Sequence, residues 1–174
     1  MASKDYFLKI EGVEGESGDS KHKGEIDIES FEWGESRDLA PGDLRNRQLQ
    51  MTDFHFTTFT SKASTKLMTA CATVQKFEKA TFTLRKAGGD QQEYMKFIFY
   101  DVRIASYSIN GPATETSRNE KIGHEKRENS IPLENIVLNY GAIEVEYREQ
   151  KSVGDLGGKN RFNYNLKQAV VQER

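Results

Sequence analysis

Residues 77–109 decide the fold class of this chain: they read FEKATFTLRK (77–86), AGGDQ (87–91) and QEYMKFIFYDVRIASYSI (92–109). In the first part, apolar and polar side chains alternate with a period of two, which is typical of a β-strand that buries one face. The Gly-Gly-Asp sequence that follows predicts a hairpin turn. The returning stretch YMKFIFY is apolar at both parities, which predicts a strand that is covered on both faces.

Shorter alternating stretches extend this sheet in both directions, at residues 6–10, 25–35, 48–60, 136–147 and 162–166. Two of them change phase. Ile26 and Ile28 have one parity while Phe31 and Trp33 have the other, so either a β-bulge lies near residues 29–30 or both faces are covered. The stretch 136–147 changes phase at its glycine and is predicted to be one bulged strand. The total of seven or eight strands predicts a barrel or a sandwich.

One helix is expected over about residues 64–75. Ser64 is a suitable N-cap, and the apolar side chains of Leu67, Met68, Cys71 and Val74 follow at helical spacing. Together with the strand pattern, this stripe predicts a core that includes Phe31, Trp33, Leu67, Met68, Cys71, Phe82 and Leu84.

Length and charge limit the possible function classes. The chain has 174 residues and a net charge of −2, so we expect one domain over residues 1–174 without an electrostatic preference for nucleic acid or anionic membrane. No stretch is apolar enough to span a membrane. The first residues, MASKDYFLK, lack the apolar core of a cleaved leader, so synthesis in the cytoplasm is expected, and any export would not use such a leader.

The sequence offers no convincing catalytic or metal site. His22 lies in DSKHK (19–23) beside Ser20, but no third orienting group or nucleophile-elbow motif accompanies the pair. His22, His55 and His124 are scattered, and Cys71 is alone on the helix stripe, where an inert thiol is expected. We therefore predict a protein that is not an enzyme and that needs no cofactor or metal.

Two long polar loops are predicted, at residues 36–47 and 110–130. The first has little apolar content to hold it on its own subunit, so we expect it to contact a neighbouring copy. Because open strand edges must be covered or paired, the pattern also favours self-assembly. The residues assigned to this subunit or ring interface are Asp38, Leu39, Pro41, Asp43, Leu44 and Arg45.

Several blocks, in this order, resemble a known family. They are GES (15–17), DSKHK (19–23), EID (25–27), SFEWG (30–34), KASTKLMTAC (62–71), LRKAGG (84–89), EY (93–94), LNY (138–140) and IEVEY (143–147). Together they resemble the haemolysin-coregulated protein family, Hcp, which forms the inner tube of bacterial type VI secretion systems. The chain departs from the family pattern in its charged loop at 37–47, in a longer loop at 110–130, and in Phe162 where a Trp is frequent.

The resemblance implies a mainly β fold, a flattened antiparallel barrel of two packed sheets with one short helix. It also implies hexameric rings that stack into a hollow tube, with sheath, spike and baseplate proteins as partners and effectors in the lumen. The family is secreted without a cleaved leader and is similar to phage tail tube proteins.

Strand alternation then assigns a lumen-facing set. Phe31 and Trp33 should meet the core, so Ser30 and Glu32 point the opposite way. The polar face of the strand at 77–86 is predicted to line the wall as well, through Lys79, Thr81, Thr83 and Arg85. Alternatively, these faces meet bulk solvent on the outside. The rival functions are a monomeric barrel that binds a small ligand or carbohydrate, a phage tail-tube-like protein, and an enzyme with an unrecognised site.

Overall fold

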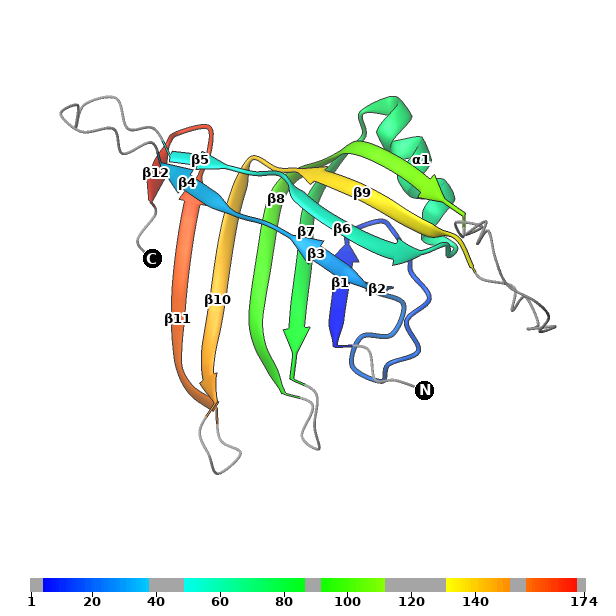
Figure 1. Cartoon of the computed structure of the whole chain (residues 1–174). Helices are drawn as coiled ribbons and strands as arrows, with labels where there is room; N and C mark the ends of the chain where they lie inside the picture. The colour runs from blue at the N-terminus through cyan, green and yellow to red at the C-terminus, as the bar shows by residue number, and fades with distance from the viewer. Residues whose placement is uncertain (1–4, 38–48, 87–91, 112–130, 151–155, 172–174) are drawn as a thin grey trace, which may run out of the picture.

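A computed structural model describes residues 5–37, 49–86, 92–111, 131–150 and 156–171 of the chain. These residues form mostly antiparallel strands and one helix (Figure 1). The elements are β1 (Tyr6–Ile10), β2 (Ile26–Asp27), β3 (Ser30–Glu32), β4 (Glu35–Arg37), β5 (Leu49–Met51), β6 (Phe54–Phe59), α1 (Ala63–Thr73), β7 (Lys76–Arg85), β8 (Glu93–Asn110), β9 (Leu133–Asn139), β10 (Ala142–Gln150), β11 (Leu156–Asn165) and β12 (Val170–Val171).

The strands build two layers that share β8. The large layer has the order β12-β11-β10-β8-β7-β1-β2, and the small layer contains β3, β6, β9 and the second half of β8. Figure 1 shows the small layer crossing in front of the large one. The predicted two-layer fold is confirmed, but the described strands do not close into a barrel, because β3 pairs only with β6 and β12 only with β11.

The bend in β8 explains how one strand serves both layers. Asp101 has a φ of 55°, and the Gly141 N–H donates to the Tyr100 carbonyl beside it. A Cβ at Gly141 would lie 3.0 Å from the Asp101 Cβ, which is tighter than ordinary packing allows. The predicted bulged strand at 136–147 is therefore two strands, β9 and β10, which leave this bend in different layers.

The phase change near residues 29–30 has a similar origin. The Ile28 N–H donates to the Tyr6 carbonyl in the large layer, whereas the next N–H, of Glu29, donates to Thr57 in the small layer. Ile28 is buried, and Phe31 packs against Phe82 with 4.7 Å between the ring centroids. The chain thus changes layer at this point, so that side chains of both parities face one core.

The core is an aromatic cluster between the layers. Phe54 of β6 lies 4.9 Å from Phe82 of β7 and 5.0 Å from Phe99 of β8, measured between ring centroids. Among the residues that sequence assigned to the core, Leu67, Phe82 and Leu84 are buried, and Phe31, Trp33 and Cys71 are partly buried against the cluster. The Trp33 indole N–H also donates to the Tyr140 hydroxyl at 2.7 Å.

Helix α1 begins earlier and is rotated relative to the prediction. Lys62 is the N-cap residue, and the Ser64 hydroxyl accepts the Ser61 backbone N–H at 2.9 Å instead of capping the helix. Val74 ends the helix with a φ of 53°. The core prediction is wrong for Met68, which is 40% exposed. The face that packs inward consists of Ala63, Ser64, Leu67 and Ala70.

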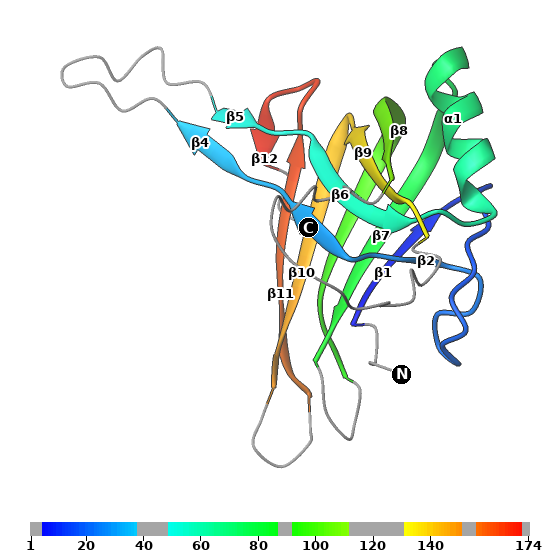
Figure 2. The ribbon, with the colours of Figure 1, turned by 45° about the vertical axis from the view of Figure 1, so that its right-hand side comes forward.

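The β4–β5 ribbon and α1 mark opposite ends of the small layer. Figure 2 shows the ribbon projecting on the side away from α1. The lower ends of β7, β8, β10 and β11 extend beyond the small layer in both views. All six predicted interface residues, from Asp38 to Arg45, lie outside the residues that the structure describes.

Candidate functional site

The outward sides of the two layers form two different surfaces. The outward side of β3, β6 and β9, together with the second half of β8, is called the open face. The outward side of β1 and β7 is called the covered face, because residues 12–25, the cover segment, lie across it. Phe31 of β3 packs on Phe82 of β7 across the core, so the side chains that alternate with these two residues point in opposite directions.

The open face carries rows of small polar side chains. Ser30, Thr57, Asn135 and Ser108 are directly opposite one another on four neighbouring strands. Ser30 Oγ lies 2.6 Å from Thr57 Oγ1, and the Ser30 and Ser108 side chains are exposed. A second row runs through Glu32, His55, Val137 and Ser106. These two rows are mostly polar, whereas the next row on the same face contains Phe59, which is 42% exposed, opposite Leu133.

The covered face has a different environment although its strand pattern is similar. Lys79 and Thr81 remain partly exposed, but Thr83 and Arg85 are 4% and 2% exposed, respectively. The cover segment buries these two side chains inside the subunit, so the structure corrects their assignment to an open channel wall. The structure also separates Lys79 and Thr81 from Ser30 and Glu32, because the two pairs lie on opposite sides of the molecule.

Backbone contacts build the cover segment. The Gly15 N–H donates to the Gly24 carbonyl at 2.7 Å, the Ser17 N–H to the Glu25 carbonyl at 2.9 Å, and the Gly24 N–H to the Ser17 carbonyl at 3.0 Å. A Cβ at Gly15 would lie 2.2 Å from the Glu25 carbonyl oxygen, so only glycine fits there. Gly24 has a φ of 75°, which also favours glycine.

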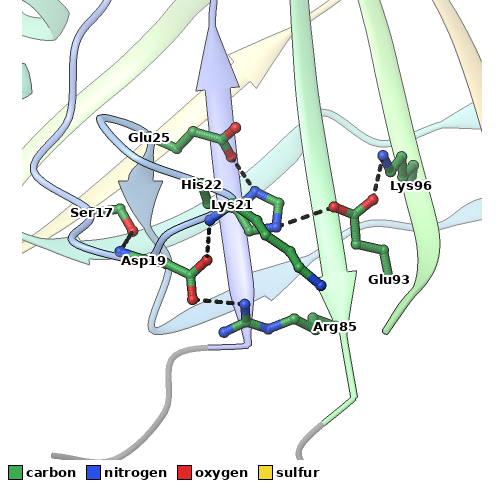
Figure 3. Close-up of polar contacts among 8 residues, drawn as sticks. All are labelled: Ser17, Asp19, Lys21, His22, Glu25, Arg85, Glu93 and Lys96. Carbon is green, nitrogen blue, oxygen red and sulfur yellow. Dashed lines mark hydrogen bonds and ion pairs between the residues drawn. The ribbon is translucent and has the colours of Figure 1, made fainter. Parts of the chain in front are cut away.

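His22 is the centre of the polar network under this segment (Figure 3). Its imidazole is 4% exposed and stacks on Phe7, with 4.0 Å between the ring centroids. Nδ1 lies 2.9 Å from Glu25 Oε2, and Nε2 lies 3.4 Å from Glu93 Oε1. Lys96 Nζ pairs with the other oxygen of Glu93 at 2.5 Å. The ring is therefore placed between two carboxylates from different elements.

Arg85 provides the second attachment. Its Nη1 donates to Asp19 Oδ2 at 2.7 Å, and its guanidinium lies 4.8 Å from the centre of the Phe7 ring. Desolvation opposes ionisation of Asp19, but the hydrogen bonds from Arg85 and from the Lys21 backbone outweigh it, so the pKa of Asp19 lies below its ordinary value. Asp19 and Arg85 are 66 residues apart in sequence, which is why strand alternation alone did not reveal the pair.

This arrangement attaches a segment and does not present a nucleophile. The Ser17 hydroxyl accepts the Asp19 backbone N–H, and both nitrogens of His22 face carboxylates. Within the described ranges no three His, Cys, Asp or Glu side chains form a group suited to a metal ion. His55 lies on the open face, and His124 lies outside the described residues. In the sequence, the glycines and the DSKHK motif drew attention to the cover segment. Only the structure showed that this segment lies over β1 and β7.

Beside the network lies a pocket of about 240 Å³ at the lower ends of β8 and β10. Lys21, Glu93 and Lys96 of the network also line this pocket, together with Tyr94 and Arg148. Its lining is mostly charged or polar, unlike the predominantly apolar, enclosed cavities that bind small ligands.

The profile of the family described as "Type VI secretion system effector, Hcp" matches residues 7–147. The chain belongs to the Hcp family. It is 32% identical over 171 residues to protein Hcp1 of Pseudomonas aeruginosa, a match that covers 95% of this chain and 97% of that protein. This Hcp-family chain is thus a subunit of the type VI secretion tube, and the resemblance inferred from its sequence blocks is confirmed.

Solved structures agree with this assignment. A structure described as a type six secretion system protein has a TM-score of 0.82 and 27% identity, and the match covers 98% of this chain and 100% of that one. Hcp1 of Salmonella typhimurium has a TM-score of 0.75 at 27% identity, with 97% and 98% of the two chains covered. In the described part of this Hcp-family chain, α1 is too short to cross a membrane.

Proposed function

We propose that this chain, as a single tube domain over residues 1–174, assembles into hexameric rings that stack into a hollow tube, and that the open face lines the bore. The observation that supports this most is the polar row Ser30–Thr57–Asn135–Ser108, which crosses all four strands of the small layer. A bore that lets different effectors pass needs a wetted surface without large apolar side chains, and this row has that character.

The edges of the small layer support ring closure. β3 pairs only with β6, and β8 beyond Arg103 pairs only with β9 among the described strands. Free edges of this kind are aggregation hazards unless a neighbour pairs with them. When β3 of one copy lies beside β8 of the next, the open faces continue from copy to copy as one wall. Such a head-to-tail contact forms a closed ring when six equal rotations return to the first copy.

The proposal includes location and partners. The subunit is made in the cytoplasm and leaves the cell with the tube. Its partners are other copies of itself, the sheath, spike and baseplate of the secretion machine, and effectors in the bore. The loop with Asp38, Leu39, Pro41, Asp43, Leu44 and Arg45 stays assigned to the contact between subunits or rings.

Light scattering and electron microscopy of the purified chain test the assembly. We expect a particle of about six times the chain mass of 19.8 kDa and images of rings. A strict monomer at micromolar concentration would contradict the assembly and would favour a ligand-binding barrel.

Substitution of Glu32, which is exposed on the open face, tests the orientation of the subunit in the ring. Glu32→Trp places a bulky indole side chain in the bore, so effector retention should fall. Assembly into hexameric rings and the melting temperature should stay near those of the wild type. The matched control is Lys79→Trp on the opposite side of the molecule, which should leave effector retention unchanged. If Glu32→Trp abolished the rings, this position would belong to a packed contact and not to the bore.

A further inference from the structure

The His22 imidazole has a hydrogen-bonding requirement that only one of its protonation states meets. Nδ1 lies 2.9 Å from a Glu25 oxygen, and Nε2 lies 3.4 Å from a Glu93 oxygen without a well-aligned hydrogen bond. A neutral imidazole has a single N–H and directs a lone pair at whichever carboxylate it does not serve. The imidazolium has two N–H donors, one for each side. At 4% exposure, water is excluded from most of the ring and does little to relieve the unsatisfied contact.

The charged groups on this face come from the cover segment and three strands. The cover segment contributes Asp19, Lys21 and Glu25, β7 contributes Arg85, and β8 contributes Glu93 and Lys96. β2 contributes Asp27, which lies opposite Phe7 of β1, the uncharged ring on which His22 stacks. Arg85 is paired with Asp19, and Lys96 is paired with Glu93. The two carboxylates that contact the imidazole directly come from opposite sides of the ring, and a positive charge on His22 interacts favourably with both of them.

We propose that His22 is a proton-dependent clasp: its imidazolium fastens the cover segment to β8 through Glu93, and loss of the proton loosens the segment from the covered face. In the protonated state, Glu25 holds the ring on the segment side and Glu93 holds it on the sheet side. When the proton leaves, one ring nitrogen carries a lone pair that faces a carboxylate oxygen, so that contact no longer has a hydrogen-bond donor. The fastening is present while His22 carries its second proton and is lost when that proton leaves.

The clasp also connects the covered face to a surface available to partners. Glu93 and Lys96 line the pocket at the lower ends of β8 and β10, and so does Lys21 of the cover segment. When His22 loses its proton, Glu93 loses its charged contact with the cover segment but keeps the ion pair with Lys96, and the segment that carries Lys21 becomes less firmly placed. The charge pattern at this end of the subunit therefore depends on pH. This inference is independent of ring formation and of the orientation of the bore.

Hydrogen exchange of the full chain tests the clasp directly. The reporter amides are Gly15, Ser17 and Gly24, whose N–H groups bond within the cover segment. After correction for the intrinsic pH dependence of exchange, their protection should fall as the pH rises from 5.5 to 8. Exchange at the imidazole C2 position, followed by mass spectrometry on the same samples, reports the titration of His22 itself and is suitable for large assemblies.

Three variants separate the clasp from other effects of pH. His22→Gln keeps a polar side chain that does not titrate, so the protection should become independent of pH. Glu93→Gln keeps His22 and Glu25 but removes the negative charge on β8 that faces the ring, so the slope should become shallower. His55→Gln removes an exposed histidine on the open face and should retain the wild-type slope.

The outcomes decide between a clasp and a static contact. A flat protection profile in the wild type overturns the proposal, and so does an unchanged slope in His22→Gln. If His22→Gln fails to fold, Glu93→Gln decides: an unchanged slope of protection in that variant shows that Glu93 does not hold the imidazolium. Because every readout lies within the subunit, failure here is distinguishable from failure of the tube proposal, which is read from particle mass and images.

Discussion

The open face and the covered face derive from similar strand patterns and meet different environments. On β3, Ser30 and Glu32 alternate with aromatic residues and remain exposed. On β7, Thr83 and Arg85 alternate with Phe82 and Leu84, yet they are buried under the cover segment. The difference teaches that alternation shows which side chains share a face, whereas a distant segment decides whether that face meets water. A polar side chain opposite the core is therefore not a surface residue by default.

The largest effect should follow from disturbing the cover segment at Gly15. Gly15→Ala places a Cβ 2.2 Å from a backbone oxygen that cannot move without breaking the segment. We expect a loss of about 3 kcal/mol or more in the free energy of unfolding, measured by urea denaturation. Gly18→Ala is the matched control, because a Cβ there meets nothing within 4 Å. Equal stability of the two variants would mean that the segment does not cover the face as described.

Arg85 should show the next largest effect. Arg85→Met removes a buried cation and leaves Asp19 without its guanidinium partner, so a loss of roughly 3 kcal/mol is expected from thermal or urea unfolding. Lys79→Met on the same strand is the control and should change stability by about 0.5 kcal/mol or less. If the two substitutions had the same small effect, the covered face would behave like the open face and the contrast would disappear.

Asp101, at the bend of β8 between the layers, gives a prediction for acid pH. Hydrogen bonds from Lys167 and Lys76 lower the pKa of Asp101 to about 2. The folded state therefore prefers the carboxylate: its contribution is present above the ordinary value of 3.8 and is lost as the pH falls through about 2. Asp101→Asn should remove this contribution at neutral pH, and the melting temperature of the variant should depend less on pH between pH 4 and pH 2. Added salt should weaken the effect, since both lysines are exposed. If the melting temperature of Asp101→Asn depended on pH as it does in the wild type, the acid sensitivity would come from other carboxylates.

The smallest effect on stability is expected on the open face. Glu32→Gln changes an exposed side chain, so the free energy of unfolding should stay within about 0.5 kcal/mol of the wild-type value. The measurement is urea denaturation in parallel with Arg85→Met. A large loss for Glu32→Gln would show that a buried contact exists at this position and would remove the distinction between the faces.

The sequence by itself determined the local features of this protein. Alternation around Phe82 placed β7, whereas the predicted Gly-Gly-Asp turn lies outside the described residues. The apolar pattern of YMKFIFY indicated a strand inside the sheet, and β8 does lie between β7 and β10, but it is not covered on both faces: Phe97 and Phe99 are buried, while Tyr100 on the other face is exposed. The ordered motif blocks led to the Hcp family. These features depend on neighbours within a few residues, because side-chain period and turn chemistry are set by local backbone geometry.

Only the tertiary structure decided how these elements are covered. It showed that the change of phase after Ile28 is a change of layer and that α1 turns Ala70 inward and Met68 outward. It also showed that Arg85 meets Asp19 across 66 residues of sequence. Burial is a property of what packs on a face, and the packing partners here come from distant parts of the chain, so no local pattern records them.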